Sequence, residues 1–346
     1  MTHSAPVRLC CLALAALVLV ADAAATPQDK VNVPEGGSTG VLAEARLLIK
    51  EGKARVAIEK LQALAEPTEP EVAHLLGVAY YHADDHVRAI EQLTPLAATW
   101  PEGSLQRREA VQILGLCNFI VGRFAEAIPF LEATRVWATN PELGYVLGQA
   151  YVQTRSPDRA RQVFASTYGV EADSAAAYLL AAQMMIRLEF EEFAESQLKR
   201  AIEMDPRLPQ AHALLGQIAI FQGRLDEGIA LTEREIALNP GSAMAFHQLG
   251  DALVRQAKWD EGIVALQKSI WLNPFYSAPY IVLGKAYMKK EQPATAEGML
   301  IRAIEYDPNN RTAHYLLGQL YQQMGRLEEA KRQFAIAERL QGQPGR

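Results

Sequence analysis

The apolar residues of positions 209–342 fall in pairs of short runs, and each run has the spacing of one face of a helix. In the final pair, Leu316, Leu317 and Leu320 belong to the first run. After a turn at Gly325, a second run repeats the spacing with leucine, alanine and phenylalanine. Apolar residues at steps of about three and four predict an amphipathic helix. Each pair of runs therefore predicts two antiparallel helices joined by a short turn.

Small residues punctuate these runs at a fixed step. A Leu-Gly pair stands inside the first run of each copy, and its glycines follow one another at steps of 34 residues, at Gly216, Gly250, Gly284 and Gly318. A fixed period of about 20–50 residues is typical of a solenoid of stacked units. The step holds back to Gly148 and is irregular before it. We expect nine copies within an array over 41–342, near 38–69, 70–107, 108–140, 141–174, 175–208, 209–242, 243–276, 277–310 and 311–342.

The small residues and prolines have a steric role in such a unit. Two helices that cross closely need a small residue on each, and in most copies an alanine follows the glycine after twelve positions. Gly228 and Gly262 replace that alanine in two copies. A proline ends most copies, because proline cannot continue a helix but suits the first turn of the next one. Copy 141–174 lacks it, which indicates either a softer junction near 169–174 or a glycine C-cap.

These features resemble the tetratricopeptide repeat. The resemblance rests on Leu-Gly, the later alanine and proline, and an aromatic residue three positions after the glycine, at Tyr80, Tyr151, Tyr287 and Tyr321. It covers about 300 residues. It implies an all-α, right-handed superhelical solenoid of about nine antiparallel helix pairs. The four extra residues around Pro101–Ser104 amount to about one helical turn, so we expect Ser104 to begin a longer helix.

The first forty residues have a different character. Residues 1–25 place Arg8 before an apolar run of about a dozen residues and end in small residues, as a secretory signal does. The run is short for a membrane span, although an uncleaved anchor is the alternative. A lipid-anchored form is less expected, because Cys10 and Cys11 do not follow the run. Residues 26–40 have a linker composition. We therefore expect a periplasmic or secreted protein, with association to the cell envelope as a further option.

Charge and cysteine content restrict the function. The formal net charge is -6 and the chain has no cluster of basic residues, which argues against a nucleic-acid partner. Removal of the signal leaves Cys117 as the last of three cysteines, so no intrachain disulfide can form. Cys117 lies in an apolar helix with no His or Lys close to it in sequence, and we expect a buried, inert thiol. A reactive or intermolecular thiol is the alternative.

No catalytic motif stands out along the chain. The nearest approach is the run from His82 to His86, two histidines four residues apart that flank Asp84 and Asp85. On one continuous helix this spacing could hold a metal ion, but here it falls on the expected turn, so packing is the favoured role. His212 and His314 occupy the family's aromatic packing position. We expect no enzyme, no cofactor and no metal ion, with an unrecognised catalytic site as the remaining alternative.

The resemblance implies a binding groove lined by the first helices of successive copies. The positions that the family points inward are Tyr145, Gln149, Leu179, Leu180, Gln183, Ile186, Leu214, Gln217, Ile220, Phe221, Val282, Met288, Tyr315 and Gln319. Glutamine recurs among them and would suit the main chain of an extended peptide, unless it is merely common after Leu-Gly. The apolar members would suit an amphipathic helix, unless they are buried between helices. The family's lysine and asparagine clamp for chaperone tails is missing.

We therefore expect a non-enzymatic scaffold or adaptor that binds a peptide or helix of a partner protein in its groove. The alternative is a structural subunit of an envelope assembly, for instance in secretion or polysaccharide export, that docks by its edges. Its final helix would leave Ile336 and Leu340 uncovered, which is consistent with self-association or with docking on a partner. Contact with a membrane is expected only if the signal segment is retained.

Overall fold

The structure is a computed structural model that describes residues 38–64, 69–138 and 140–341. The expected signal segment and residues 26–37 of the expected linker lie outside the described residues. In the described part the chain forms 18 α-helices and no strand. None of these helices combines the length and the apolar character needed to span a membrane. The all-α prediction is confirmed.

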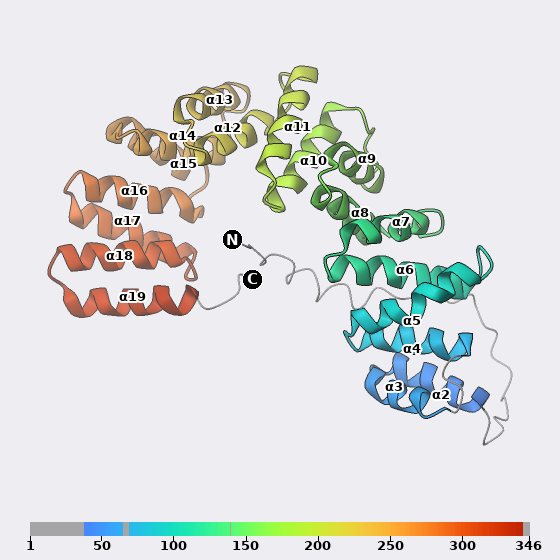
Figure 1. Cartoon of the computed structure of the whole chain (residues 1–346). Coiled ribbons are helices and arrows are strands. Elements are labelled where there is room, and N and C mark those ends of the chain that lie inside the picture. The colour runs from blue at the N-terminus through green and yellow to red at the C-terminus, as the bar shows by residue number, and fades with distance from the viewer. Residues whose placement is uncertain (1–37, 65–68, 139, 342–346) are drawn as a thin grey trace, which may run out of the picture. The chain divides into compact units, whose positions relative to one another are not determined.

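The helices follow one another along the chain in two compact units (Figure 1). Eight successive pairs of helices, four in each unit, pack together in the described part of the chain. Unit 1 holds the described residues up to Asp173 together with Met184–Phe190, and unit 2 holds Ser174–Gln183 and the residues from Glu191 onward. The pairs of unit 1 are α2 (Ser38–Lys50) and α3 (Ala54–Gln62), α4 (Pro70–His82) and α5 (His86–Thr99), α6 (Leu105–Ile120) and α7 (Phe124–Thr134), and α8 (Pro141–Gln153) and α9 (Pro157–Thr167).

The division between the units passes through α10 (Ala175–Arg187). The remaining helices belong to unit 2, namely α11 (Glu191–Met204), α12 (Ala211–Phe221), α13 (Leu225–Leu238), α14 (Ala243–Arg255), α15 (Trp259–Leu272), α16 (Ser277–Lys289), α17 (Pro293–Tyr306), α18 (Arg311–Gln323) and α19 (Leu327–Gln341). Within unit 2 each helix from α11 onward packs on the next along the chain. The first helices α12, α14, α16 and α18 also contact one another in order, so they form a continuous row.

Glycines let the two helices of a pair approach closely. A Cβ atom built on Gly250 would lie 2.5 Å from Leu266 Cγ and 3.0 Å from the carbonyl oxygen of Gly262. One built on Gly262 would lie 3.1 Å from the carbonyl oxygen of Gly250. These distances are shorter than ordinary van der Waals contact, so α14 and α15 cross at a spacing that only small residues permit. The steric role expected for these positions is confirmed.

Two local predictions about helix ends are also confirmed. α6 has 16 residues where most first helices have 13, and the Oγ of its N-cap Ser104 accepts a hydrogen bond from Arg107 N at 3.4 Å. The extra residues therefore lengthen one helix. The run from His82 to His86 spans a turn, because α4 ends at His82, α5 begins at His86, and Asp84 between them has a left-handed backbone with φ 61°.

Candidate binding site

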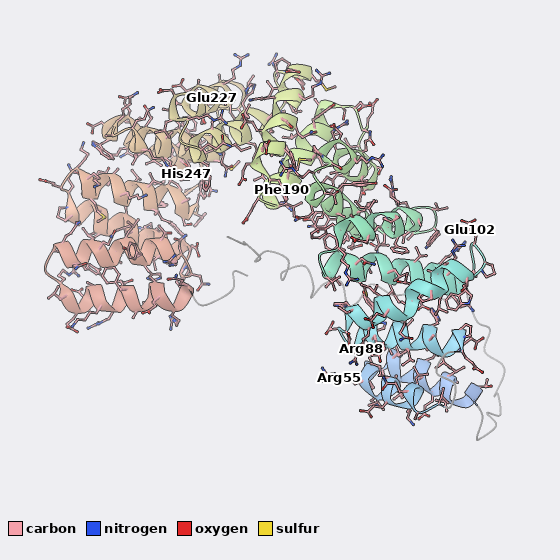
Figure 2. All side chains as sticks on the ribbon, in the orientation of Figure 1. Arg55, Arg88, Glu102, Phe190, Glu227 and His247 are labelled. Carbon is pink, nitrogen blue, oxygen red and sulfur yellow. The ribbon has the colours of Figure 1, made fainter. Side chains whose placement is uncertain are left out.

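A pocket of about 180 Å³ opens on the row of first helices in unit 2. Its lining comes from α12, from α14 and from the residue before α16, namely Gln217, Ile220, Phe221, Met244, His247, Gln248, Asp251, Arg255 and Tyr276. Figure 2 labels His247 of α14 on the edge of this helix layer opposite to Glu227 of the second helix α13. The pocket therefore belongs to the first-helix side of the repeats.

The rim of the pocket is apolar and open to solvent. Phe221 is 78% exposed at the last position of α12, and Met244 is 40% exposed in the first turn of α14. The ring of Tyr276 meets the ring of His247 edge to face, with ring centroids 5.2 Å apart. A solvated phenylalanine beside a pocket gains free energy when a partner covers it, at roughly 25 cal/mol per Å² of apolar surface removed from water.

The floor of the pocket combines the buried Ile220 with two polar side chains. Gln248 is 7% exposed, and its Nε2 donates to Gln217 Oε1 over 3.4 Å. Its Oε1 and the Nδ1 of His247 are buried and have no hydrogen-bond partner among the described residues. A buried polar atom without a partner costs about 1–3 kcal/mol. The floor thus keeps two hydrogen-bonding atoms whose partner is not supplied within the described part of the chain.

The formal charges at the pocket compensate each other. Arg255 Nε donates to Asp251 Oδ2 at 2.8 Å, one helical turn away on α14. Burial lowers the pKa of His247, and the nearby carboxylate of Asp251 acts in the opposite, weaker sense. An imidazole with a lowered pKa is neutral at pH 7. The pocket therefore presents neutral hydrogen-bonding groups and no unpaired charge.

Three residues expected in the groove, Gln217, Ile220 and Phe221, meet at this pocket. The other expected positions lie elsewhere. Tyr315 is 46% exposed on α18, where its hydroxyl oxygen is 3.4 Å from Gln319 Nε2. Leu179, Leu180, Ile186, Leu214, Met288 and Tyr145 are half-buried on their helices, and Gln183 Nε2 donates to Gln210 Oε1 at 3.3 Å.

Some expected groove residues have little surface to offer. Gln149, Ile220 and Val282 are 6%, 5% and 8% exposed. For Ile220 and Val282 this is the alternative considered above for the apolar positions, burial between helices. Ile220 lies at the base of the pocket, while Gln149 belongs to unit 1. Tyr145 and Ile186 belong to unit 1 as well, so the expected set is distributed over both units.

The sequence interpretation did not include the residues that give the pocket its chemistry, His247, Gln248, Met244 and Tyr276. Comparison of the copies within this chain could have identified Gln248. The position two residues before the small residue of the first helix is apolar in the other copies and glutamine in this one. The residues at this position are Leu75, Ile113, Val146, Leu180, Leu214, Gln248, Val282 and Leu316. Tyr276 similarly replaces the N-cap serine or asparagine that Ser242 and Asn310 provide.

The candidate reactive groups are in packed surroundings. Cys117 is fully buried, and burial raises the pKa of its thiol to about 12. A histidine that is distant in sequence lies near it in space, since His86 Nδ1 is 3.8 Å from Cys117 Sγ. Burial lowers the pKa of His86, so both groups are neutral near pH 7. Among the described residues, no cluster of three or more His, Cys, Asp or Glu has the arrangement of a metal site.

His212 and His314 are buried, as expected for a packing position. The Nε2 atom of each lies 3.0 Å from a proline carbonyl oxygen in the preceding loop, Pro206 O and Pro308 O respectively. A carbonyl oxygen only accepts hydrogen bonds, so each Nε2 carries the hydrogen. These rings connect a helix to the loop before it.

Some solved structures resemble parts of this chain. A crystal structure of MamA is 24% identical, with 46% of this chain and 94% of that chain covered and a TM-score of 0.40. MamA from Desulfovibrio magneticus RS-1 is 21% identical, with 49% and 96% covered and a TM-score of 0.43. A structure of pilF from Pseudomonas aeruginosa is 17% identical, with 59% and 93% covered and a TM-score of 0.47.

Comparison with curated proteins finds no match. Family models, in contrast, match in three places. One model described as tetratricopeptide repeat matches residues 42–104 and 186–243, and a second with the same description matches residues 287–344. Together the two models cover more than half of the chain, in both units, and the described residues that they match are mostly helical. The chain therefore belongs to the tetratricopeptide repeat family.

Proposed function

We propose that this protein is a non-enzymatic scaffold that binds a segment of another protein on the first-helix row of unit 2, with the pocket between α12 and α14 as the main contact. Tetratricopeptide repeat proteins are typically interaction scaffolds, which supports the general role. The composition of residues 1–25 supports a location outside the cytoplasm.

The size of the pocket favours a protein partner over a small molecule. Sites for cofactors and drug-sized ligands usually enclose about 300–1,000 Å³. The pocket of about 180 Å³ is smaller and lies on an open helix surface. It has room for one side chain of a longer ligand that continues along the neighbouring helices. A segment of a partner protein meets this description.

The observation that carries the proposal is the position of Phe221 beside the pocket. Interface hot spots are enriched in aromatic residues that become buried at the centre of the contact. Phe221 is 78% exposed, and the buried polar floor lies next to it. An apolar rim with polar groups beneath it can supply both affinity and orientation to a bound segment.

The test is in vivo crosslinking and affinity purification with the full chain carrying Phe221→Glu. Phe275→Glu is the matched control, because Phe275 is 76% exposed in the same unit but does not line the pocket. We expect Phe221→Glu to remove the captured partner and Phe275→Glu to retain it, with both variants keeping the helical circular dichroism of the wild type.

An unchanged set of partners with Phe221→Glu would overturn the proposal. If crosslinks then occurred only through α19, docking by the edge of the array would be the better account. Leu327 at the start of α19 is 57% exposed, so that helix has apolar surface for such a contact or for self-association.

A further inference from the structure

Two residues that line the pocket reduce stability, a buried glutamine and a tyrosine at a helix start. Gln248 is buried in a column that is otherwise apolar, and its Oε1 has no partner among the described residues. Tyr276 stands at the N-cap of α16 and makes no capping hydrogen bond through its side chain. Loss of an N-cap bond typically costs about 1 kcal/mol.

Local rules of folding are usually broken where a site has a function. Here both broken rules face the same 180 Å³ pocket. Neighbouring copies have residue types that avoid these losses of stability. Leu214 and Val282 take the place of Gln248 one repeat away, and the Ser242 Oγ at the start of α14 accepts a hydrogen bond from Ala245 N at 3.2 Å. Gln248 and Tyr276 thus lower the stability of the fold, while both place hydrogen-bonding or aromatic groups at the pocket.

The charges at the pocket favour an uncharged ligand group. Asp251 and Arg255 both line the pocket, so a charged group of either sign would have one like charge and one opposite charge beside it. Because Asp251 and Arg255 are already paired at 2.8 Å, neither charge is available without loss of that ion pair. A neutral group that both donates and accepts hydrogen bonds meets no such repulsion.

The amide of Gln248 is suited to such a group. Its oxygen accepts and its nitrogen donates, and a half rotation of the side-chain amide exchanges the two. A peptide group has the same complement, one N–H and one C=O. The aromatic and thioether side chains of Phe221, Met244 and Tyr276 line the same pocket and supply its apolar rim.

We infer that the pocket recognises an uncharged, extended segment of a partner protein through its main chain. Gln248 hydrogen-bonds one peptide group of the segment, and an adjacent apolar side chain lies against Phe221, Met244 and Tyr276. Gln248 therefore determines specificity. This inference rests on the proposed function, and it adds the chemical class of the segment and the residue that reads it.

The test begins with selection of peptides from a phage-displayed random octapeptide library on the full chain. Peptides that bind are labelled with a fluorophore, and their Kd is measured by anisotropy. We expect the selected peptides to contain an uncharged stretch with one large apolar residue. Gln248→Leu is expected to weaken binding at least tenfold while it maintains or raises Tm, because leucine restores the residue type of the column.

Gln197→Leu is the matched control. Gln197 is 5% exposed, has an Oε1 without a partner among the described residues as Gln248 does, and does not line the pocket. It should leave the Kd unchanged. A further set of peptides replaces one peptide N–H at a time by an ester oxygen. One of these esters should bind the wild type about tenfold more weakly. The same ester should have little further effect on binding to Gln248→Leu, because the two changes remove the same hydrogen bond.

Two results would overturn the inference and leave the proposed function in place. One is a set of peptides whose binding needs a carboxylate or an ammonium group. The other is binding that is lost with Phe221→Glu but unaffected by Gln248→Leu and by every ester. If Phe221→Glu also leaves the selected peptides bound, or if the library yields no binder, both the inference and the proposed site are wrong.

Discussion

At the scale of single residues, the copy that contains His247 and Gln248 also has a close helix crossing. Gly262 replaces the alanine found at this position in most repeats. A Cβ atom on Gly262 would lie 2.8 Å from Val254 Cγ2, 3.1 Å from Gly250 O and 3.2 Å from Val254 N. Two of these atoms belong to the backbone and cannot rotate away. The repeat pattern alone, with alanine in most copies, would therefore predict that a glycine-to-alanine change raises stability here, whereas the contacts predict that it lowers stability.

We predict that Gly262→Ala destabilises unit 2. Alanine is favoured over glycine in a helix by about 1 kcal/mol, but overpacking costs about 1–3 kcal/mol. The net loss should be about 1 kcal/mol, measured as a lower urea midpoint by circular dichroism. The control is Gly298→Ala in α17, where nothing lies within 4 Å of the added Cβ and stability should rise. A gain with both variants would contradict the close crossing.

Family positions predict the pocket only in part. Gln217, Ile220 and Phe221 could be predicted because the family directs those positions toward the groove. Gln248 and Tyr276 could not, because most other copies of this chain have an apolar residue at the first position and a capping serine or asparagine at the second. A comparison of the copies within this chain does identify them, since polar and apolar preferences are physical constraints that a functional residue violates.

At the scale of helices, polar contacts join each repeat of unit 2 to the next. Arg224 Nη2 bonds Glu195 Oε2 at 2.7 Å, and three repeats later Arg326 Nη1 bonds Glu297 Oε1 at 2.8 Å. The intervening repeats use a different contact, in which Gln256 Nε2 donates to Asp226 Oδ1 at 2.7 Å. Lys290 and Asp260 form the equivalent ion pair one repeat on. The turns therefore carry a recurring set of bonds between repeats.

The contact between Glu195 and Arg224 makes the stability of unit 2 dependent on pH. The hydrogen bond from Lys199 and, secondarily, the charge of Arg224 lower the pKa of Glu195. A carboxyl whose pKa is lower in the folded state contributes stability above its unfolded value, about 4.3, and the contribution is lost as pH falls through the folded value. We predict that Glu195→Gln lowers the free energy of unfolding by at most about 1 kcal/mol at pH 7.

The measurement is Tm between pH 3 and 7 for the wild type, Glu195→Gln and the control Glu233→Gln, whose side chain is exposed on α13. The difference between the wild type and Glu195→Gln should shrink as pH decreases below about 4. A difference that stayed constant over this range would show that the substitution acts through packing and not through charge.

Helix positions were the most predictable level of this structure. The spacing of apolar residues and the small residues at the crossings determine where each pair forms, and Ser104 begins the longer helix α6 as expected. Inter-repeat bonds were less predictable. They depend on which long polar side chains happen to reach across a turn, and two different sets satisfy the same backbone geometry.

At the scale of the whole molecule, the chain passes between the two units over residues 173–191, and this stretch begins where the terminal proline of a repeat is missing. In a repeat array, stability is approximately a sum of terms within repeats and between neighbours. Damage in one unit is then expected to have a local effect. Cys117 offers a reporter for unit 1, because its fully buried thiol, with a pKa of about 12, reacts only when the surrounding helices open.

We predict that a substitution in unit 2 leaves this reporter protected. In a Cys10→Ser, Cys11→Ser background, Gly262→Leu should reduce helicity in moderate urea, and the rate at which Cys117 reacts with a disulfide reagent should stay that of the unmutated background. Leu131→Ala is the positive control, since Leu131 is 1% exposed against α6 and its truncation creates a cavity costing about 2–5 kcal/mol. If Gly262→Leu accelerated the reaction as much as Leu131→Ala does, the two units would unfold as one.

Coupling of that kind would require interactions that extend across the repeats beyond nearest neighbours. A partner bound at the pocket would then stabilise unit 1 as strongly as unit 2.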